Sequence, residues 1–120
     1  MKKKAWISWG GWNGHEPDKT AGLFKRLLEE KGFAVDLTDS LEDLKDAGKM
    51  AVYDLLVPVW TMSTIDKEAL KGMLEAVKTG VGIGGWHGGA GDAFRNETDY
   101  QFMIGGQWVA HPGNIIPYEV

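Results

Sequence analysis

The sequence predicts an α/β fold, in which a parallel β-sheet forms the middle of three layers and helices cover both its faces. Short β-favouring runs alternate along the chain with segments whose apolar residues recur at helical spacing. Residues 53–60 are almost continuously apolar, which is typical of a central parallel strand buried on both faces. Strands that alternate with helices imply right-handed crossovers, and we expect the strand order 2-1-3-4.

Length, charge and cysteine content narrow the function classes. The 120 residues suit one domain, spanning 1–120. A net charge of −4 does not favour nucleic acid or an anionic membrane surface as a partner. The absence of cysteine excludes disulfides, thiolate metal ligands and a cysteine nucleophile. No apolar run is long enough to span a membrane. We expect a cytoplasmic protein, the default for a chain without cysteine, and the charge favours a small-molecule partner.

The first half of the chain predicts two strands and two helices. Residues 5–9 form the first strand, which Gly10-Gly11 stops. A helix capped by Asp18 or Thr20 follows and ends at Gly32. Its apolar face is Leu23, Phe24, Leu27 and Leu28. Residues 33–37 form the second strand, and a short helix carrying Leu41, Leu44 and Ala47 ends at Gly48.

The second half repeats this alternation. Residues 53–60 form the third strand, and Pro58 indicates that its end is near. Ser63 or Thr64 caps a helix that Gly80 terminates, with the inner face Ala69, Leu70, Met73, Leu74 and Val77. Residues 81–86 form the fourth strand, Phe94 and 102–104 line a further helix or two turns, and 108–109 and 115–120 are extended. The predicted sheet core is Ile7, Leu55, Leu56, Val57 and Ile83.

A glycine-rich stretch at 80–92 surrounds one histidine. Gly85-Trp86-His87-Gly88-Gly89 has the spacing of a nucleophile elbow, with histidine where hydrolases carry serine and amidotransferases carry cysteine. An elbow would direct the His87 ring into a cleft, and Asp92 would cap the segment that follows. His87 is therefore the candidate catalytic residue that we rank first.

The remaining unusual residues follow predicted strands, at the edge of the sheet where α/β proteins bind ligands. All three histidines, His15, His87 and His111, lie in such loops, and we expect them to face one cleft. Four of the six tryptophans also fall at strand ends: Trp12, Trp60, Trp86 and Trp108. Flat indole faces at these places either stack on a sugar ring or cover the rim of the core.

Several of these segments carry a family resemblance. The quoted segments are 11–16, 60–63, 84–92 (Gly-Gly-Trp-His-Gly-Gly-Ala-Gly-Asp), Tyr100, 104–106 (Ile-Gly-Gly) and His111-Pro112. Together they resemble the ThuA-like, or trehalose-utilisation, family over nearly the whole chain. The resemblance implies a flavodoxin-like sheet, as in class I glutamine amidotransferases, without the catalytic cysteine and therefore without amidotransferase activity. It also implies a role in carbohydrate utilisation, with a disaccharide as the small-molecule partner.

The candidate site residues take three roles. His87 and His15 are candidate general acids or bases, with Glu16 as a carboxylate partner. Alternatively His15, His87 and His111 bind a divalent metal such as zinc, because three imidazoles with one open position form a known catalytic site. The candidate substrate-binding residues are Trp12, Trp60, Ser63, Trp86, Asp92, Arg95 and Tyr100. For the charged residues near Asp92, a solvated and capped turn is the competing interpretation.

Two functions from different classes remain open. One is an enzyme that acts on a sugar or polyol, by hydrolysis or isomerisation. The other is a non-catalytic binding or assembly domain that kept an amidotransferase-like scaffold. Members of the resembled family continue past His111-Pro112, so we expect this chain to be a fragment or a minimal version of the domain. An uncovered extended segment at 115–120 predicts a homo-oligomer.

Overall fold

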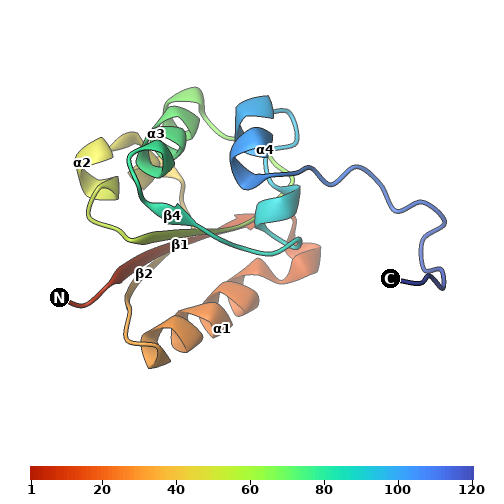
Figure 1. Cartoon of the computed structure of the whole chain (residues 1–120), viewed down its shortest axis with the longest axis horizontal. Helices are drawn as coiled ribbons and strands as arrows, with labels where there is room; N and C mark the ends of the chain where they lie inside the picture. The colour runs from red at the N-terminus through yellow and green to blue at the C-terminus, as the bar shows by residue number, and fades with distance from the viewer.

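The computed structural model describes residues 1–120 and confirms the α/β fold (Figure 1). Its single sheet has the order β2-β1-β3-β4, as predicted, and every neighbouring pair is parallel. The strands are β1 (Lys4–Gly11), β2 (Ala34–Thr38), β3 (Leu55–Thr61) and β4 (Gly82–Ile83). The order places the carboxyl ends of β1 and β3 side by side at the centre of the sheet, where the chain switches from one face to the other.

Helices cover both faces of the sheet. In Figure 1, α1 (Pro17–Glu30) lies on one side, and α2 (Ala47–Met50), α3 (Lys67–Lys78) and α4 (Thr98–Ile104) lie on the other. Three single turns of 3-10 helix connect these elements: η1 (Asn13–His15), η2 (Glu42–Lys45) and η3 (Ala90–Asp92). None of the helices combines the length and the apolar character that a membrane-spanning segment needs.

Alternation along the strands produces two cores. Trp6 of β1 is buried under α2 and α3, whereas the next residue, Ile7, is buried under α1. Burying one large apolar side chain contributes about 1.5–3 kcal/mol, so these inward residues dominate the stability of the sheet. Three of the five predicted core residues, Ile7, Leu56 and Val57, are buried. Leu55 and Ile83 are only half-buried, because β4 is short and borders solvent.

Both long helices begin at residues other than the predicted caps. Helix α1 begins at Pro17, directly after Glu16 in the left-handed conformation, so Asp18 and Thr20 lie inside its first turn. Proline suits this position because its missing N–H has no helical partner there. Helix α3 is capped by Asp66, which accepts hydrogen bonds from the Glu68 and Ala69 N–H groups. The predictions of Asp18, Thr20, Ser63 and Thr64 as caps were therefore wrong.

The buried side of α1 is narrower than its apolar pattern suggested. Ala21 is buried and Phe24 and Leu28 pack beside it, but Leu23 and Leu27 are exposed. A helix that packs on a sheet with one face buries only a stripe of about 100°. The short helix predicted near Leu44 is divided into η2 and α2. Asp46 caps α2 by accepting from the Lys49 N–H, and Gly48 lies inside that helix instead of ending it.

Pro58 was expected near the end of its strand, and it lies in the middle of β3, three residues before the end at Thr61. Leu56 O accepts a hydrogen bond from Gly84 N, so the even-numbered residues of this part of β3 direct their backbone groups toward β4. Pro58 faces the same side, where β4 has already ended at Ile83. Its missing N–H therefore removes no bond between strands.

The glycine-rich stretch does not form an elbow. Strand β4 ends at Ile83, a turn occupies 87–89, and only the single turn η3 follows. His87 does not have a positive φ, which a strained strand-to-helix elbow would give it. The strand predicted at 81–86 is thus shortened to two residues, and the segments 108–109 and 115–120 pair with no strand. Phe94 lies before α4 and is buried with a φ of 50°, whereas Phe102 on α4 is exposed.

Candidate functional site

The candidate site begins where β1 and β3 end together. Gly11 has a φ of 79°, and a Cβ there would lie 2.1 Å from the Thr61 carbonyl oxygen, so this position requires glycine. The chain then turns into η1, which places His15 above the end of β3. A hydrogen bond of 2.8 Å joins His15 Nδ1 and the hydroxyl of the buried Thr61. This bond fixes the plane of the ring and leaves His15 Nε2 free.

His87 lies beside His15. The two ring centroids are 5.9 Å apart and the planes are inclined at 69°. Gly88, next to His87, lies against the His15 ring: a Cβ at this position would be 3.4 Å from His15 Cγ, which is van der Waals contact. His87 is exposed and makes no hydrogen bond through its ring, which leaves both nitrogens available to a ligand.

The third histidine comes from the segment after α4. Trp108 N donates to Gly91 O over 3.3 Å, which ties this segment to η3. The Trp108 ring lies 5.8 Å from the ring of His87 and 4.7 Å from that of His111. His111 is in turn 6.5 Å from His87. The structure therefore brings together three histidines from three separate segments.

The four tryptophans divide into two groups by their neighbours. Trp12 is exposed and meets His15 edge-on, with 4.9 Å between the centroids, so Trp12 and Trp108 flank the histidines. Trp60 lies over Gly10 and packs toward Phe94 in the core. Trp86 packs on Phe24 of α1 at 4.5 Å. The structure therefore does not place Trp60 and Trp86 beside the histidines. We call His15, His87, His111, Trp12 and Trp108 the histidine site.

Asp92 and Arg95 form an ion pair that contacts Trp108 of the histidine site. Asp92 is 3 % exposed, and both Nε and NH2 of Arg95 lie 2.7 Å from its Oδ1. The Arg95 guanidinium also lies 4.5 Å from the centre of the Trp108 ring, in a cation–π arrangement. Asp92 is therefore a partner of Arg95 and not the predicted helix cap. Through Arg95 it holds Trp108 in place.

Tyr100 and Ser63 also lie away from the histidines. Tyr100 is buried, its hydroxyl donates to Ala90 O over 2.6 Å, and burial raises the pKa of that hydroxyl well above its ordinary value. Its role is to hold η3 against α4. Ser63 is exposed, with a φ of 59°, in the turn after β3. Backbone bonds from Met62 N to Asp92 O and from Phe94 N to Met62 O join that turn to η3.

Glu16 was predicted as the carboxylate partner of His15, but the structure pairs it with Lys19. The left-handed conformation of Glu16 at the start of α1 directs its carboxylate one turn along the helix. The hydrogen bond from Lys19 to Glu16 raises the pKa of that lysine. The group that orients His15 is Thr61, which the sequence analysis overlooked. Its signals were its position at the end of the apolar run 53–60 and its place in the segment 60–63 that carries the family resemblance.

One protein family matches nearly the whole chain. The family described as ThuA, trehalose utilisation, matches residues 4–120. The chain belongs to the trehalose utilisation family. No curated protein and no solved structure gives a match.

The donor set of the histidine site bears on the predicted metal. No three His, Asp or Glu side chains converge in a geometry that could hold a metal ion. Zinc binds histidine nitrogens at about 2.0–2.1 Å, so the imidazoles of one site must come closer than 5.9 and 6.5 Å between ring centroids. The residue types fit zinc, but the side chains would have to move inward to bind it.

A groove of about 450 Å³ adjoins the histidine site. It runs between the end of β4, η3 and α4, and His87 forms part of its wall. Its other lining residues are Ile83, Gly84, Gly85, Trp86, Ala90, Gly91 and Ile104. Apolar side chains therefore form only half of the lining, and the glycine backbone and the His87 imidazole form the rest. Such a surface suits a ligand that has both apolar and hydrogen-bonding faces.

Proposed function

We propose that this protein binds a sugar of the trehalose type at the histidine site and that His15 and His87 hydrogen-bond its hydroxyls. One observation carries the proposal: three imidazoles and two indoles from separate segments gather at the carboxyl edge of a parallel sheet. This is the usual place for a ligand in such a fold. The family's description as trehalose utilisation supports the same ligand class.

The side chains take complementary roles in this proposal. Trp12 and Trp108 present indole faces to the C–H face of a pyranose ring. His15 is the acid or base: when Nδ1–H donates to the Thr61 hydroxyl, the Nε2 lone pair can accept a proton from a sugar hydroxyl. In the other tautomer, Nε2–H donates instead. His87 supplies the second hydrogen-bonding group on the same side.

Calorimetry and NMR titration with trehalose test this proposal. We expect wild-type protein to bind, and His87→Ala and Trp108→Ala each to weaken binding about tenfold, since each removes a contact of order 1 kcal/mol. Leu23→Ala on the exposed side of α1 is the control and should bind like wild type. Equal binding by wild type and His87→Ala, both folded, would refute the role of the histidine site.

The alternative function is a non-catalytic sugar-binding or assembly domain, and one observation favours it. Glycoside hydrolysis ordinarily needs two free carboxyl groups. Glu16 and Asp92, the carboxylates nearest the histidines in sequence, are paired with Lys19 and Arg95. If trehalose binds but no product forms over long incubation, with or without added zinc, the binding domain is correct. Metal analysis of protein purified without a histidine tag decides whether zinc is part of the site.

A further inference from the structure

A second groove lies on the outer side of α4 and contains none of the three histidines. It has a volume of about 310 Å³. Its lining is Thr98, Gln101, Phe102, Gly105, Gly106 and Gln107, and we call it the α4 groove. The first four of these residues share one side of the helix, at spacings of three and four, and the chain returns past that side through Gly106 and Gln107.

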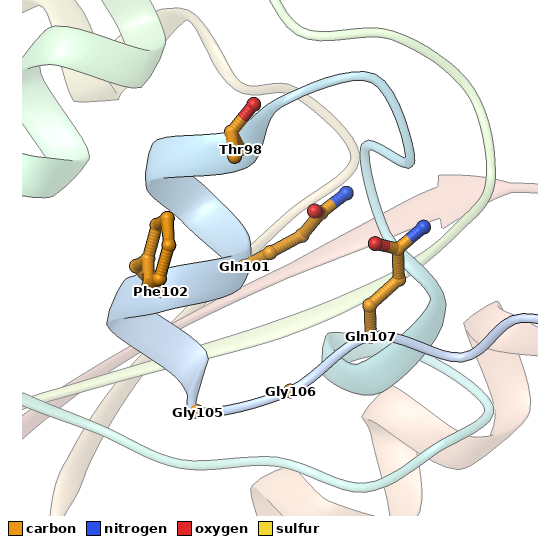
Figure 2. A pocket seen from close by; sticks show the side chains of 6 residues that line it. All are labelled: Thr98, Gln101, Phe102, Gly105, Gly106 and Gln107. Atoms are coloured by element: carbon orange, nitrogen blue, oxygen red, sulfur yellow. The ribbon is translucent and has the colours of Figure 1, made fainter.

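Phe102 is the unexplained residue of this groove. Tyr100, Met103 and Ile104 already pack α4 against the core, whereas Phe102 is 81 % exposed. Figure 2 shows its ring at one side of the groove and the side-chain amides of Gln101 and Gln107 toward the other. An aromatic face opposite amide groups is an arrangement that can contact the apolar face of a sugar ring and its hydroxyls together.

The polar groups of the groove are available to a ligand. Gln101 Nε2 donates to Arg95 O over 2.7 Å, which orients the amide and leaves Gln101 Oε1 free to accept. The side chains of Thr98 and Gln107 make no hydrogen bond within the chain. An amide offers both donors and an acceptor, which matches neighbouring hydroxyls on a sugar.

The absence of charged side chains from the lining of the α4 groove favours an uncharged ligand. A quarter of the residues in the chain are charged, yet none of the six that line the α4 groove is. A phosphate or carboxylate ligand would find no cation there. The volume is at the lower end of the roughly 300–1,000 Å³ of small-molecule pockets, which suits one monosaccharide ring.

We propose that the α4 groove is a second carbohydrate subsite, which holds one pyranose ring while the histidine site holds the other. The two sites are neighbours along the chain, because Gln107 of the groove directly precedes Trp108 of the histidine site. A disaccharide or longer uncharged sugar therefore contacts both. This inference rests on the proposed function, because it assigns the second ring of the same ligand.

The test is a trehalose titration followed by NMR on the full chain, with the side-chain amide signals of Gln101 and Gln107 and the ring signals of His15 and His87 assigned. We expect both sets to shift with one Kd. Histidine shifts without glutamine shifts overturn the subsite and leave the proposed function standing. Glutamine shifts alone overturn the proposed function and the shared ligand. If neither set shifts, both proposals fail.

Variants of Phe102 add a second measurement. Because the ring is exposed, Phe102→Ala should fold normally and raise the Kd for trehalose about three- to tenfold, the effect of one lost aromatic contact. Phe102→Trp keeps a stacking face and should restore binding. Tyr118→Ala removes an equally exposed ring outside the groove and should leave the Kd unchanged. An unchanged Kd in Phe102→Ala overturns the subsite.

Discussion

Replacing Arg95 by Met tests the support of the histidine site, because it removes every charged partner of Asp92 while keeping an unbranched apolar stem. Asp92 is 3 % exposed and its carboxylate has no hydrogen bond except those from Arg95. Breaking a buried ion pair on one side costs about 3–5 kcal/mol. The Arg95 side chain is 36 % exposed, so water reaches part of the pair and we expect a loss of roughly 2–3 kcal/mol.

Urea unfolding followed by circular dichroism measures this loss, and thermal unfolding should show a fall of roughly 10 °C in Tm. Asp92→Asn removes the buried charge, so the double variant Asp92→Asn/Arg95→Met should lose less stability than Arg95→Met alone. The indole N–H signal of Trp108 should also move in Arg95→Met, because the guanidinium lies over that ring. A loss below about 0.5 kcal/mol with an unmoved indole signal would refute the argument that this pair is buried and holds Trp108.

Four further predictions concern other parts of the chain. Thr61→Val removes the hydroxyl that bonds His15 Nδ1, so the ¹⁵N NMR signals of the His15 ring should report a changed tautomer and sugar binding should weaken about tenfold with the fold intact. An unchanged ring spectrum would contradict the hydrogen bond. Gly72→Ala should lower the free energy of unfolding by at least about 1–3 kcal/mol, the usual cost of overpacking, because the new Cβ would lie 1.7 Å from Leu44 O. In the control Gly22→Ala the new Cβ meets open space, so this variant should stabilise α1 by about 0.5–1 kcal/mol. The hydrogen bond from the Glu68 N–H is the main cause that lowers the pKa of Asp66 below its ordinary value of 3.8. The ionised Asp66 side chain should therefore stabilise the fold fully above pH 3.8, and this stabilisation should disappear as the pH falls through the lowered pKa. Denaturation of Asp66→Ala and wild type at pH 7 and at acid pH measures the difference. Exposed apolar residues on the segment 115–120 predict self-association, so sedimentation should show oligomers that Ile116→Lys reduces, and a stable monomer would count against it.

Local patterns were sufficient for a parallel sheet covered by helices, and the flavodoxin-like fold supplied the strand order. The apolar run at 53–60 placed β3 at the centre, and the two long helices α1 and α3 were found from their apolar spacing, since strands and helices bury different periodicities. The same patterns placed His15 and His87 after strands, and parallel strands bring their carboxyl ends to one edge, so these two residues could be expected in one place. His111 follows α4 and no strand, and the backbone hydrogen bond from Trp108 to Gly91 brings its segment there.

Tertiary structure alone decided which polar groups meet there. His15 is oriented by Thr61, a residue 46 positions away, and no local pattern records such a contact. Asp92 pairs with Arg95 because burial leaves its carboxylate no other partner, whereas the sequence indicated an exposed cap. The exposure of Phe102 likewise depends on which side of α4 meets the core, and that side is chosen by Tyr100 and its neighbours when the helix packs.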